Sequence, residues 1–272
     1  MSSSAKGPKD NDFTIRIANV NGTGSASANA MLMKALFRMG IPVCGKNYFP
    51  SNIQGLPTWY EIRASGHGHL ARSGRVDIMV AMNAETYARD HACVAPGGYL
   101  IYDSTWPRSQ LFNRTDIHVI GVPLSRICNE NFAQARSRIL MKNIMYVGVL
   151  AALLDMDMQV IKGLLNEQFK AKASLLDANQ KSIDLGYAWA RENFSCPLAL
   201  RTVPIDQTRD HIMIDGNTTS ALGCVYAGAT VGAWYPITPS TSIMDKFKSF
   251  CDKYRKDPET GKSNFCIIQA ED

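Results

Sequence analysis

The sequence lacks several features that would assign it to common classes of protein. It has no run of five or six basic residues, because its formal charge of +5 comes from residues scattered over 272 positions. This pattern indicates a mild preference for anionic ligands and does not indicate nucleic-acid binding. The seven cysteines lie far apart and no two form a CxxC pair, so zinc or iron–sulfur ligation by this chain is not expected. Free thiols in a reducing compartment are expected instead.

The sequence also shows no segment typical of a targeting signal or a membrane span. Residues 1–12 are polar and contain no apolar stretch of the kind that a signal peptide needs. No later segment has the length expected of a membrane span, so we expect a cytoplasmic protein that has no membrane partner. Apolar residues make up 46% of the chain and charged residues 19%, which is enough for a packed core. Only residues 1–12 are expected to be disordered.

The order of apolar segments predicts an α/β fold with a Rossmann-like parallel sheet. Short runs rich in β-branched residues alternate with stretches of helical periodicity, and this alternation is typical of a parallel sheet covered by helices. The expected strands are 13–20, 41–45, 76–82, 98–103 and 117–122, and the expected helices are 26–39, 84–91, 139–154, 158–169 and 173–191.

Two domains are expected along the chain. Residues 13–194 form the first, and 195–211, which lack helical periodicity, form a linker. Residues 212–272 form the beginning of a second domain, with helices at 218–229 and 243–254 and a strand at 265–268. One or two helices and a strand cannot bury a core alone. We therefore expect the second domain to be completed by a longer polypeptide or by another chain.

A glycine-containing turn, Gly22-Thr23-Gly24-Ser25, follows the first expected strand and precedes a helix. Such a turn is a common phosphate site, because glycine lets the backbone approach a ligand and the helix N-terminus offers free N–H groups. Ser27 replaces the third glycine of the dinucleotide fingerprint, and no acid follows about 20 residues later. A standard NAD site is therefore disfavoured. A plain turn remains possible beside a phosphate or coenzyme A site at Gly22, Gly24 and Ser25.

The segment 47–60 is rich in aromatic and amide residues and contains two prolines. It predicts a long irregular loop, and loops of that length are uncommon unless functional. Two interpretations of the segment 47–60 and of the residues that follow it up to Arg75 remain. The region is either a lid or interface segment, or an ordered surface loop. His67 and His69 lack a third ligand at suitable spacing, so metal binding there is disfavoured.

The segment Tyr235-Pro236-Ile237-Thr238-Pro239 predicts a stiff turn. Each proline fixes its own φ and favours extended geometry in the residue before it. The hydroxyl residues at 240–242 are typical helix N-caps. An anionic group is favoured at such a helix N-terminus. A turn of this kind can hold the Thr238 hydroxyl against a ligand.

Together these segments resemble the 2-oxoacid:ferredoxin oxidoreductases. Residues 21–103, with the glycine turn, the segment 49–60 and Gly97-Gly98-Tyr99-Leu100-Ile101-Tyr102-Asp103, resemble their gamma domain. The sequence from Gly216 onward, with 235–242 and 266–272, resembles the beginning of their thiamine diphosphate-binding pyrimidine domain. The order, gamma domain first, resembles the alpha subunit of the two-subunit type and is most similar to 2-oxoglutarate:ferredoxin oxidoreductase.

The resemblance implies conversion of a 2-oxoacid, 2-oxoglutarate first, and coenzyme A to acyl-CoA and CO2, with reduction of ferredoxin. It implies that Thr238 hydrogen-bonds the substrate carboxylate, and that Glu271 lies at N1′ of the thiamine aminopyrimidine. A carboxylate there favours the imino tautomer, which can remove a proton from the thiazolium carbon. The same resemblance makes Tyr235, Pro236 and Ile237 cofactor-binding residues.

Parts of this machinery have no counterpart in the chain. No GDG segment with a following Asn, the usual Mg2+–diphosphate signature, is present. The resemblance assigns diphosphate, Mg2+ and the iron–sulfur cluster to a beta subunit, and implies a dimer of alpha–beta heterodimers that is active only when assembled. The alternative is a non-catalytic nucleotide- or partner-binding module. An NAD-dependent dehydrogenase is a weaker third hypothesis.

Overall fold

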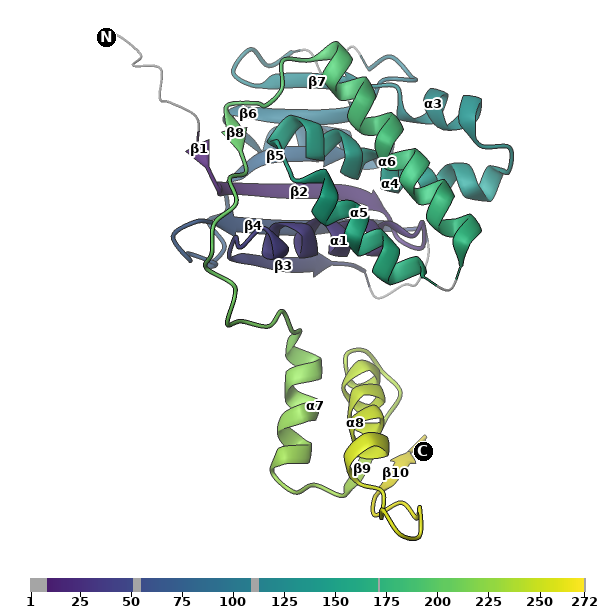
Figure 1. Ribbon diagram of the computed structural model, residues 1–272. Coiled ribbons are helices and arrows are strands. Elements are labelled where there is room, and N and C mark those ends of the chain that lie inside the picture. Colours follow the sequence, from purple (N-terminus) through teal and green to yellow (C-terminus); the bar gives the residue numbers. More distant parts are fainter. Residues whose placement is uncertain (1–8, 51–54, 109–112, 171, 272) are drawn as a thin grey trace. The chain divides into compact units, whose positions relative to one another are not determined.

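The computed structural model describes residues 9–50, 55–108, 113–170 and 172–271. The chain divides into two compact units, Met1–His211 and Ile212–Asp272 (Figure 1). The division falls where the second domain was expected to begin. Residues 195–211, expected as a separate linker, belong to the first unit.

The first unit contains a six-stranded sheet of order β3-β4-β2-β5-β6-β7. All of its strands run parallel except β4, which is antiparallel to both neighbours. This confirms the expected α/β fold with a mainly parallel sheet. The strands are β2 (Asp12–Val20), β3 (Val43–Tyr48), β4 (Pro57–Ser65), β5 (Val76–Ala81), β6 (Val94–Asp103) and β7 (His118–Val122).

Strand β4 corrects the interpretation of 47–60 as an irregular loop. Asn47 and Tyr48 end β3, and β4 begins at Pro57, a position where proline is tolerated because it is the first residue of a strand. The residues after Pro57 alternate between the two faces of the sheet. Within the intervening connection, 51–54 lie outside the described residues.

Helices cover the sheet unequally. On one face of the sheet, buried side chains of the strands, including β2, pack against the helices α1, α3, α4, α5 and α6. Several of these helices lie in front of the sheet in Figure 1. Of the described helices, α2 packs on the other face, over β5 and β6, and the short η1 contacts α2. Their bounds are α1 (Ser25–Arg38), η1 (Ala84–Thr86), α2 (Tyr87–Cys93), α3 (Leu124–Asn131), α4 (Ala135–Leu154), α5 (Met158–Phe169) and α6 (Ala173–Asn193).

Helix α4 is the central helix of the larger layer. Its 20 residues contain an 18-residue window with a mean hydropathy of 1.4, which is long and apolar enough to cross a membrane, so the expectation that no segment reaches that length was wrong. The window is 72% buried inside the protein, as in the core helix of a globular domain. A Cβ on Gly148 would lie 2.1 Å from the Ile183 carbonyl oxygen, and one on Gly186 would lie 2.2 Å from that of Met145. Glycine therefore permits the close approach of α4 and α6.

The N-terminal residues that the structure describes are ordered. Strand β1 (Lys9–Asp10) pairs in parallel with β8 (Leu200–Arg201). The Asn11 side chain accepts from Val203 N and donates to Val203 O, both at 2.8 Å. The expectation of disorder is thus wrong for residues 9–12, while 1–8 lie outside the described residues.

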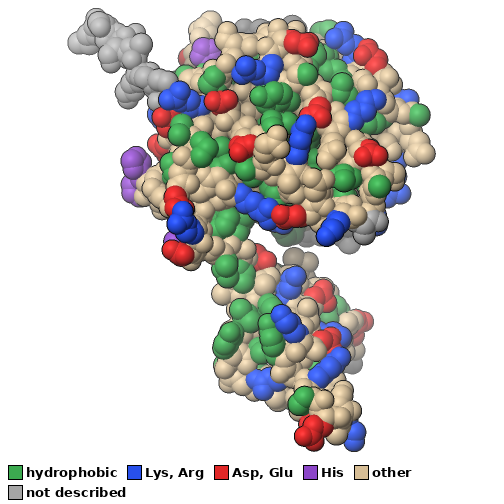
Figure 2. Space-filling view, in the orientation of Figure 1, with side chains coloured by type: hydrophobic (Ala, Val, Ile, Leu, Met, Phe, Trp, Pro, Cys, Tyr) green, Lys and Arg blue, Asp and Glu red, His purple; other side chains and the backbone are tan. Residues whose placement is uncertain are grey.

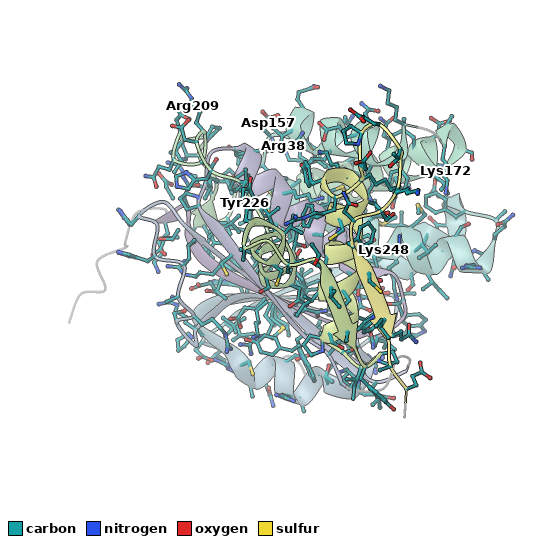
Figure 3. All side chains as sticks on the ribbon, turned by 90° about the horizontal axis from the view of Figure 1, so that it is seen from below. Arg38, Asp157, Lys172, Arg209, Tyr226 and Lys248 are labelled. Carbon is teal, nitrogen blue, oxygen red and sulfur yellow. The ribbon has the colours of Figure 1, made fainter. Side chains whose placement is uncertain are left out.

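The second unit is small. It consists of α7 (Gly216–Tyr226), β9 (Val231–Trp234), α8 (Ser240–Tyr254) and β10 (Cys266–Gln269), with β9 and β10 parallel. Among its described residues, the buried core consists of Ala221, Phe247 and Cys251, with partly buried apolar side chains packed against them. Large apolar side chains are exposed, among them Tyr226 at the end of α7, which is 85% exposed (Figure 3).

The surface charge is mixed. On the face shown in Figure 2, lysine and arginine side chains alternate with aspartate and glutamate over the first unit. All seven cysteines are free thiols, as the sequence predicted.

Candidate functional site

The turn after β9 and the residue Glu271 lie at the same edge of the small sheet. The register of the parallel pair places Trp234 beside Gln269, and Ala270 N donates to Trp234 O at 2.8 Å. The turn that begins at Tyr235 and the end that carries Glu271 therefore leave neighbouring strands together. The carboxyl ends of parallel strands are the usual ligand-binding edge of an α/β sheet.

The turn itself is held by hydrogen bonds. Ile237 N donates to Tyr235 O, and Ser240 N donates to Ile237 O, both at 2.8 Å. The Ser240 hydroxyl adds a bond to Tyr235 O at 2.7 Å. The exposed hydroxyl of Thr238 makes no hydrogen bond to a described residue, so it is available to a ligand.

The hydroxyl residues after the turn do not cap helix α8. The helix begins at Ser240, its N-cap is Pro239, and no side chain accepts from the first turn. The hydroxyls of Ser240 and Ser242 instead donate to backbone carbonyls of the turn. The expected capping role is therefore wrong, because these hydroxyls stabilise the turn that precedes the helix.

Glu271 presents an exposed carboxylate. Its Oε1 accepts from Gln269 Nε2 at 2.6 Å, which leaves the other oxygen for a ligand. Tyr235 and Ile237 are 53% and 63% exposed, and Pro236 lies between them. The structure thus brings the polar residues Thr238 and Glu271 and the apolar residues of the turn to one exposed edge.

The glycine turn of the first unit lies between β2 and α1, as the sequence predicted. Gly22 and Gly24 have φ values of 86° and 82°, in the left-handed region that favours glycine. Ser25 begins α1, whose first turn has no side-chain cap. A small cavity of about 30 Å³ lies beside it, lined in part by Ser25 and Asn29. The proposed phosphate role of Gly22, Gly24 and Ser25 stays a prediction.

Sequence reasoning missed the side chains that hold this turn. Asn143 of α4 donates through Nδ2 to Thr23 O at 2.8 Å, and Asn19 donates to Asn143 Oδ1 at 3.0 Å. The Thr23 hydroxyl donates to Asn19 Oδ1 at 3.0 Å. Because Asn143 lies far away in the sequence, no local signal could have indicated it.

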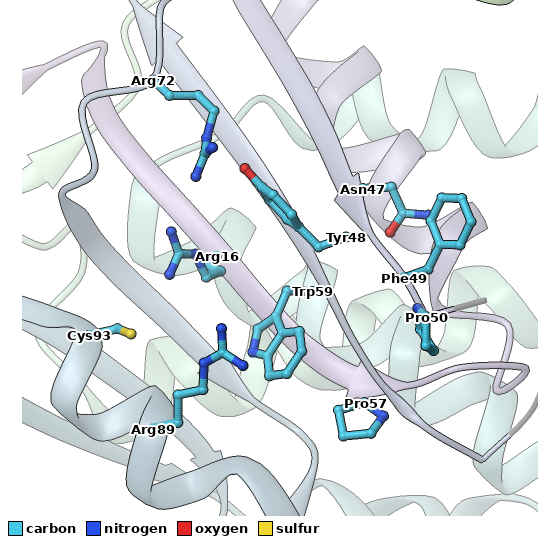
Figure 4. A pocket seen from close by; sticks show the side chains of 10 residues that line it. All are labelled: Arg16, Asn47, Tyr48, Phe49, Pro50, Pro57, Trp59, Arg72, Arg89 and Cys93. Atoms are coloured by element: carbon cyan, nitrogen blue, oxygen red, sulfur yellow. The ribbon is translucent and has the colours of Figure 1, made fainter. Parts of the chain in front are cut away.

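Two further predictions concern the region 47–75. Tyr48 and Trp59, from the segment expected as a lid or interface, line a cavity of about 550 Å³ (Figure 4). The exposed rings of His67 and His69 lie with their centroids 6.1 Å apart. Within the described part of the chain, no three His, Cys, Asp or Glu residues are grouped to hold a metal ion.

The fold of the first unit is that of an α/β domain with a mainly parallel sheet. Residues 14–189 match the family described as pyruvate ferredoxin/flavodoxin oxidoreductase. The match covers more than half of the chain, which therefore belongs to that family. This confirms the resemblance of the first unit to a gamma domain of 2-oxoacid:ferredoxin oxidoreductases.

Similar proteins agree with the family. The chain is 23% identical to 2-oxoacid:ferredoxin oxidoreductase 2, subunit alpha, of Aeropyrum pernix, over 85% of this chain and 42% of that protein. The structure of 2-oxoglutarate:ferredoxin oxidoreductase from Magnetococcus marinus matches with a TM-score of 0.83 and 24% identity, over 97% of this chain and 44% of that one. A pyruvate oxidoreductase subunit from Thermotoga maritima matches 66% of this chain and 97% of its own, with a TM-score of 0.55 and 17% identity.

These structural matches show a shared fold. The chain spans less than half the length of the Aeropyrum and Magnetococcus proteins. The Thermotoga subunit is covered over 97% of its length by 66% of this chain.

Proposed function

We propose that the chain is the alpha-type subunit of a thiamine diphosphate-dependent 2-oxoacid:ferredoxin oxidoreductase. The proposed reaction converts a 2-oxoacid and coenzyme A to acyl-CoA and CO2 and reduces ferredoxin. The observation that carries the proposal is the common position of the Tyr235–Thr238 turn and Glu271 at the carboxyl edge of two parallel strands. A chain of this family with that edge has a carboxylate acceptor and a hydroxyl donor of the kinds that such a cofactor and its substrate need.

The residues present fit the cofactor. Thiamine diphosphate, when bound, supplies the carbon nucleophile and electron sink for decarboxylation. One oxygen of the Glu271 carboxylate accepts a hydrogen bond from Gln269 Nε2 at 2.6 Å. The other oxygen would accept a hydrogen bond from a protonated ring nitrogen of the cofactor. Tyr235, Pro236 and Ile237 would pack against the pyrimidine ring. The Thr238 hydroxyl would donate to the substrate carboxylate without neutralising it.

The enzyme would be completed by other subunits. We assign diphosphate, Mg2+ and the iron–sulfur cluster to a beta subunit, and ferredoxin is the proposed electron acceptor. The proposed assembly is a dimer of alpha–beta heterodimers. The seven cysteines of this chain are free thiols, and free thiols favour the reducing cytoplasm as the location of the enzyme.

We take 2-oxoglutarate as the first substrate to test. The similar Magnetococcus enzyme is named for it, and its structure is described as holding 2-oxoglutarate, coenzyme A and succinyl-CoA. A non-catalytic partner-binding module is the alternative, and it predicts no turnover with any 2-oxoacid.

Purification of the chain alone and with its cysteine-bearing partner tests the proposal. The isolated chain should be colourless and should bind thiamine diphosphate weakly. The complex should be brown and should reduce ferredoxin with 2-oxoglutarate or pyruvate. Stoichiometric iron and sulfide on the isolated chain would contradict the division of roles between the subunits.

A further inference from the structure

The cavity of about 550 Å³ in the first unit is lined by none of the residues assigned to the proposed reaction. It lies on the sheet face opposite α1: side chains alternate along β2, so Ile15 and Ile17 face α1 and Arg16 faces the other way. Trp59 on β4 and Arg89 on α2 line it as well (Figure 4). This face is therefore distinct from the side of the sheet on which the glycine turn leads into α1.

Two arginines on one side of the cavity share one buried carboxylate. Arg16 Nε donates to Glu61 Oε2 at 3.0 Å, and Arg72 Nε donates to Glu61 Oε1 at 2.9 Å. The Glu61 side chain is only 4% exposed. One carboxylate can neutralise only one of two guanidinium groups, so this side of the cavity keeps a positive charge.

Two arginines are also held on aromatic rings. The Arg72 guanidinium lies 4.9 Å from the centre of the Tyr48 ring, and that of Arg89 lies 4.5 Å from the centre of Trp59. Trp59 Nε1 donates to the buried Asp90 at 2.8 Å, which fixes the indole. A guanidinium resting on a ring keeps its N–H edges free for oxyanions.

Arg89 carries a charge that lies near Asp90 and interacts with it electrostatically without forming an ion pair. It is exposed and makes no ion pair with a described residue. The nearby Asp90 is fully buried, and burial raises its pKa while Thr86 and Trp59 donate to it. Figure 4 shows the side chains of Arg16, Arg72 and Arg89 converging on the same space.

We propose that this cavity is a binding site for a nucleoside phosphate. The guanidinium groups of Arg16, Arg72 and Arg89 match the geometry of phosphate oxygens. Trp59 and the half-exposed Phe49 offer aromatic surface for the base. The volume is that of a small-molecule site and exceeds what an inorganic ion fills. The nucleoside phosphate is either a free nucleotide or the nucleotide end of coenzyme A.

Isothermal titration of the full 272-residue chain tests the site, with ADP, coenzyme A and inorganic phosphate as separate probes. We expect saturable binding of ADP, with Arg89→Gln about tenfold or more weaker because a charge-assisted hydrogen bond is lost. Arg126→Gln, which removes an exposed helical arginine outside the cavity, is the matched control and should bind like the wild type. Circular dichroism of each variant checks folding.

Competition between the probes identifies the source of the ligand. If coenzyme A displaces ADP and Arg89→Gln weakens both, the site takes the nucleotide end of coenzyme A; if ADP binds and coenzyme A does not displace it, the ligand is a free nucleotide. The proposal is overturned by the absence of saturable binding of either compound at millimolar concentration, by unchanged affinity in Arg89→Gln, or by phosphate binding as tightly as ADP. No 2-oxoacid or partner is present, so the measurement does not depend on turnover in the proposed reaction, and only the coenzyme A outcome would give the cavity a part in it.

Discussion

At the scale of single residues, the hydroxyl groups of one turn have different roles because their surroundings differ. The hydroxyl of Ser240 is used by the turn, with Tyr235 O as its acceptor at 2.7 Å. The hydroxyl of Thr238 has no partner among the described residues. Only the second hydroxyl is therefore available to hold a substrate.

Replacement of Thr238 by valine keeps the volume and removes the hydroxyl donor. In the assembled enzyme, Thr238→Val should lower kcat/KM for the 2-oxoacid by about 1.5 to 3 kcal/mol, as expected for a hydrogen bond to a charged group. Thr241→Val, at the start of α8, is the control and should have little effect. Unchanged kcat/KM for every 2-oxoacid tested would leave the turn with a structural role only.

Glu61 is expected to make stability depend on pH. Burial alone would raise its pKa, but hydrogen bonds from Arg72 and Arg16 outweigh burial and hold the pKa below its usual value. A carboxyl whose pKa is lower in the folded state stabilises the protein above its unfolded-state pKa, and this contribution is lost as pH falls through the folded-state value.

Urea unfolding at several pH values measures this contribution. At pH 7, Glu61→Gln should lower the free energy of unfolding. As the pH falls below about 4.5, the usual value for glutamate, the wild type should lose stability more steeply than the variant. Parallel stability curves for the two proteins would show that Glu61 does not contribute.

At the scale of elements, the contact between α4 and α6 depends on glycine. A Cβ at position 148 would lie 2.1 Å from the Ile183 carbonyl oxygen, and a backbone atom cannot move aside as a flexible side chain can. Gly148→Ala should therefore destabilise the protein by about 1 to 3 kcal/mol or more, although alanine is the better helix former.

Gly163→Ala in α5 is the matched control for that prediction. An added Cβ there has no heavy atom within 4 Å, so the helix preference of alanine should stabilise the protein by about 0.4 to 1 kcal/mol. Thermal and urea unfolding of both variants measure the difference. Equal effects of the two substitutions would mean that α4 and α6 separate at little cost.

Sequence patterns predicted those elements whose signal is local. The parallel strands β2, β5, β6 and β7 were predicted because each has a short apolar run, and the long helices were predicted from their helical periodicity. Strand β4 was missed because its polar face, with Glu61 and Arg63, made the segment resemble a surface loop. Strand β9 (Val231–Trp234) was missed because its four residues include a glycine and an alanine and its pairing with β10 is not local.

The candidate sites differ in the same way. The turn with Thr238 and the carboxylate of Glu271 could be found because each lies in a contiguous motif that resembles the family. The cavity with Arg16 and Arg89 could not be found, because its residues come from separate strands and a helix and meet only through the sheet order. Tertiary contacts of this kind leave no period in the sequence.

At the scale of the whole molecule, the two units have very different cores. The first buries a continuous core between a six-stranded sheet and its helices, whereas the second fully buries the side chains of Ala221, Phe247 and Cys251. Residues on one face of the β9–β10 pair, including Val231 and Ile268, are 63% and 50% exposed. Parallel sheets are normally covered on both faces.

Hydrogen exchange should reveal this difference directly. Amides of β9 and β10 should exchange much faster than those of β2 and β5, because local opening requires less energy where few apolar side chains are buried. Addition of the partner subunit should slow exchange in the second unit. Equal protection of both units in the isolated chain would contradict the view that the second unit depends on further polypeptide for its stability.

The central claim is that Glu271 takes part in 2-oxoacid chemistry within an assembled oxidoreductase. Its most direct test is proton–deuterium exchange at the thiazolium carbon of thiamine diphosphate, measured in complexes that contain the wild-type chain, Glu271→Gln or the exposed control Glu259→Gln. We predict that Glu271→Gln assembles normally and slows exchange by about a hundredfold to ten-thousandfold, the usual contribution of acid–base catalysis, while Glu259→Gln has no effect. Exchange at the wild-type rate in Glu271→Gln would contradict the account and would favour a non-catalytic binding module.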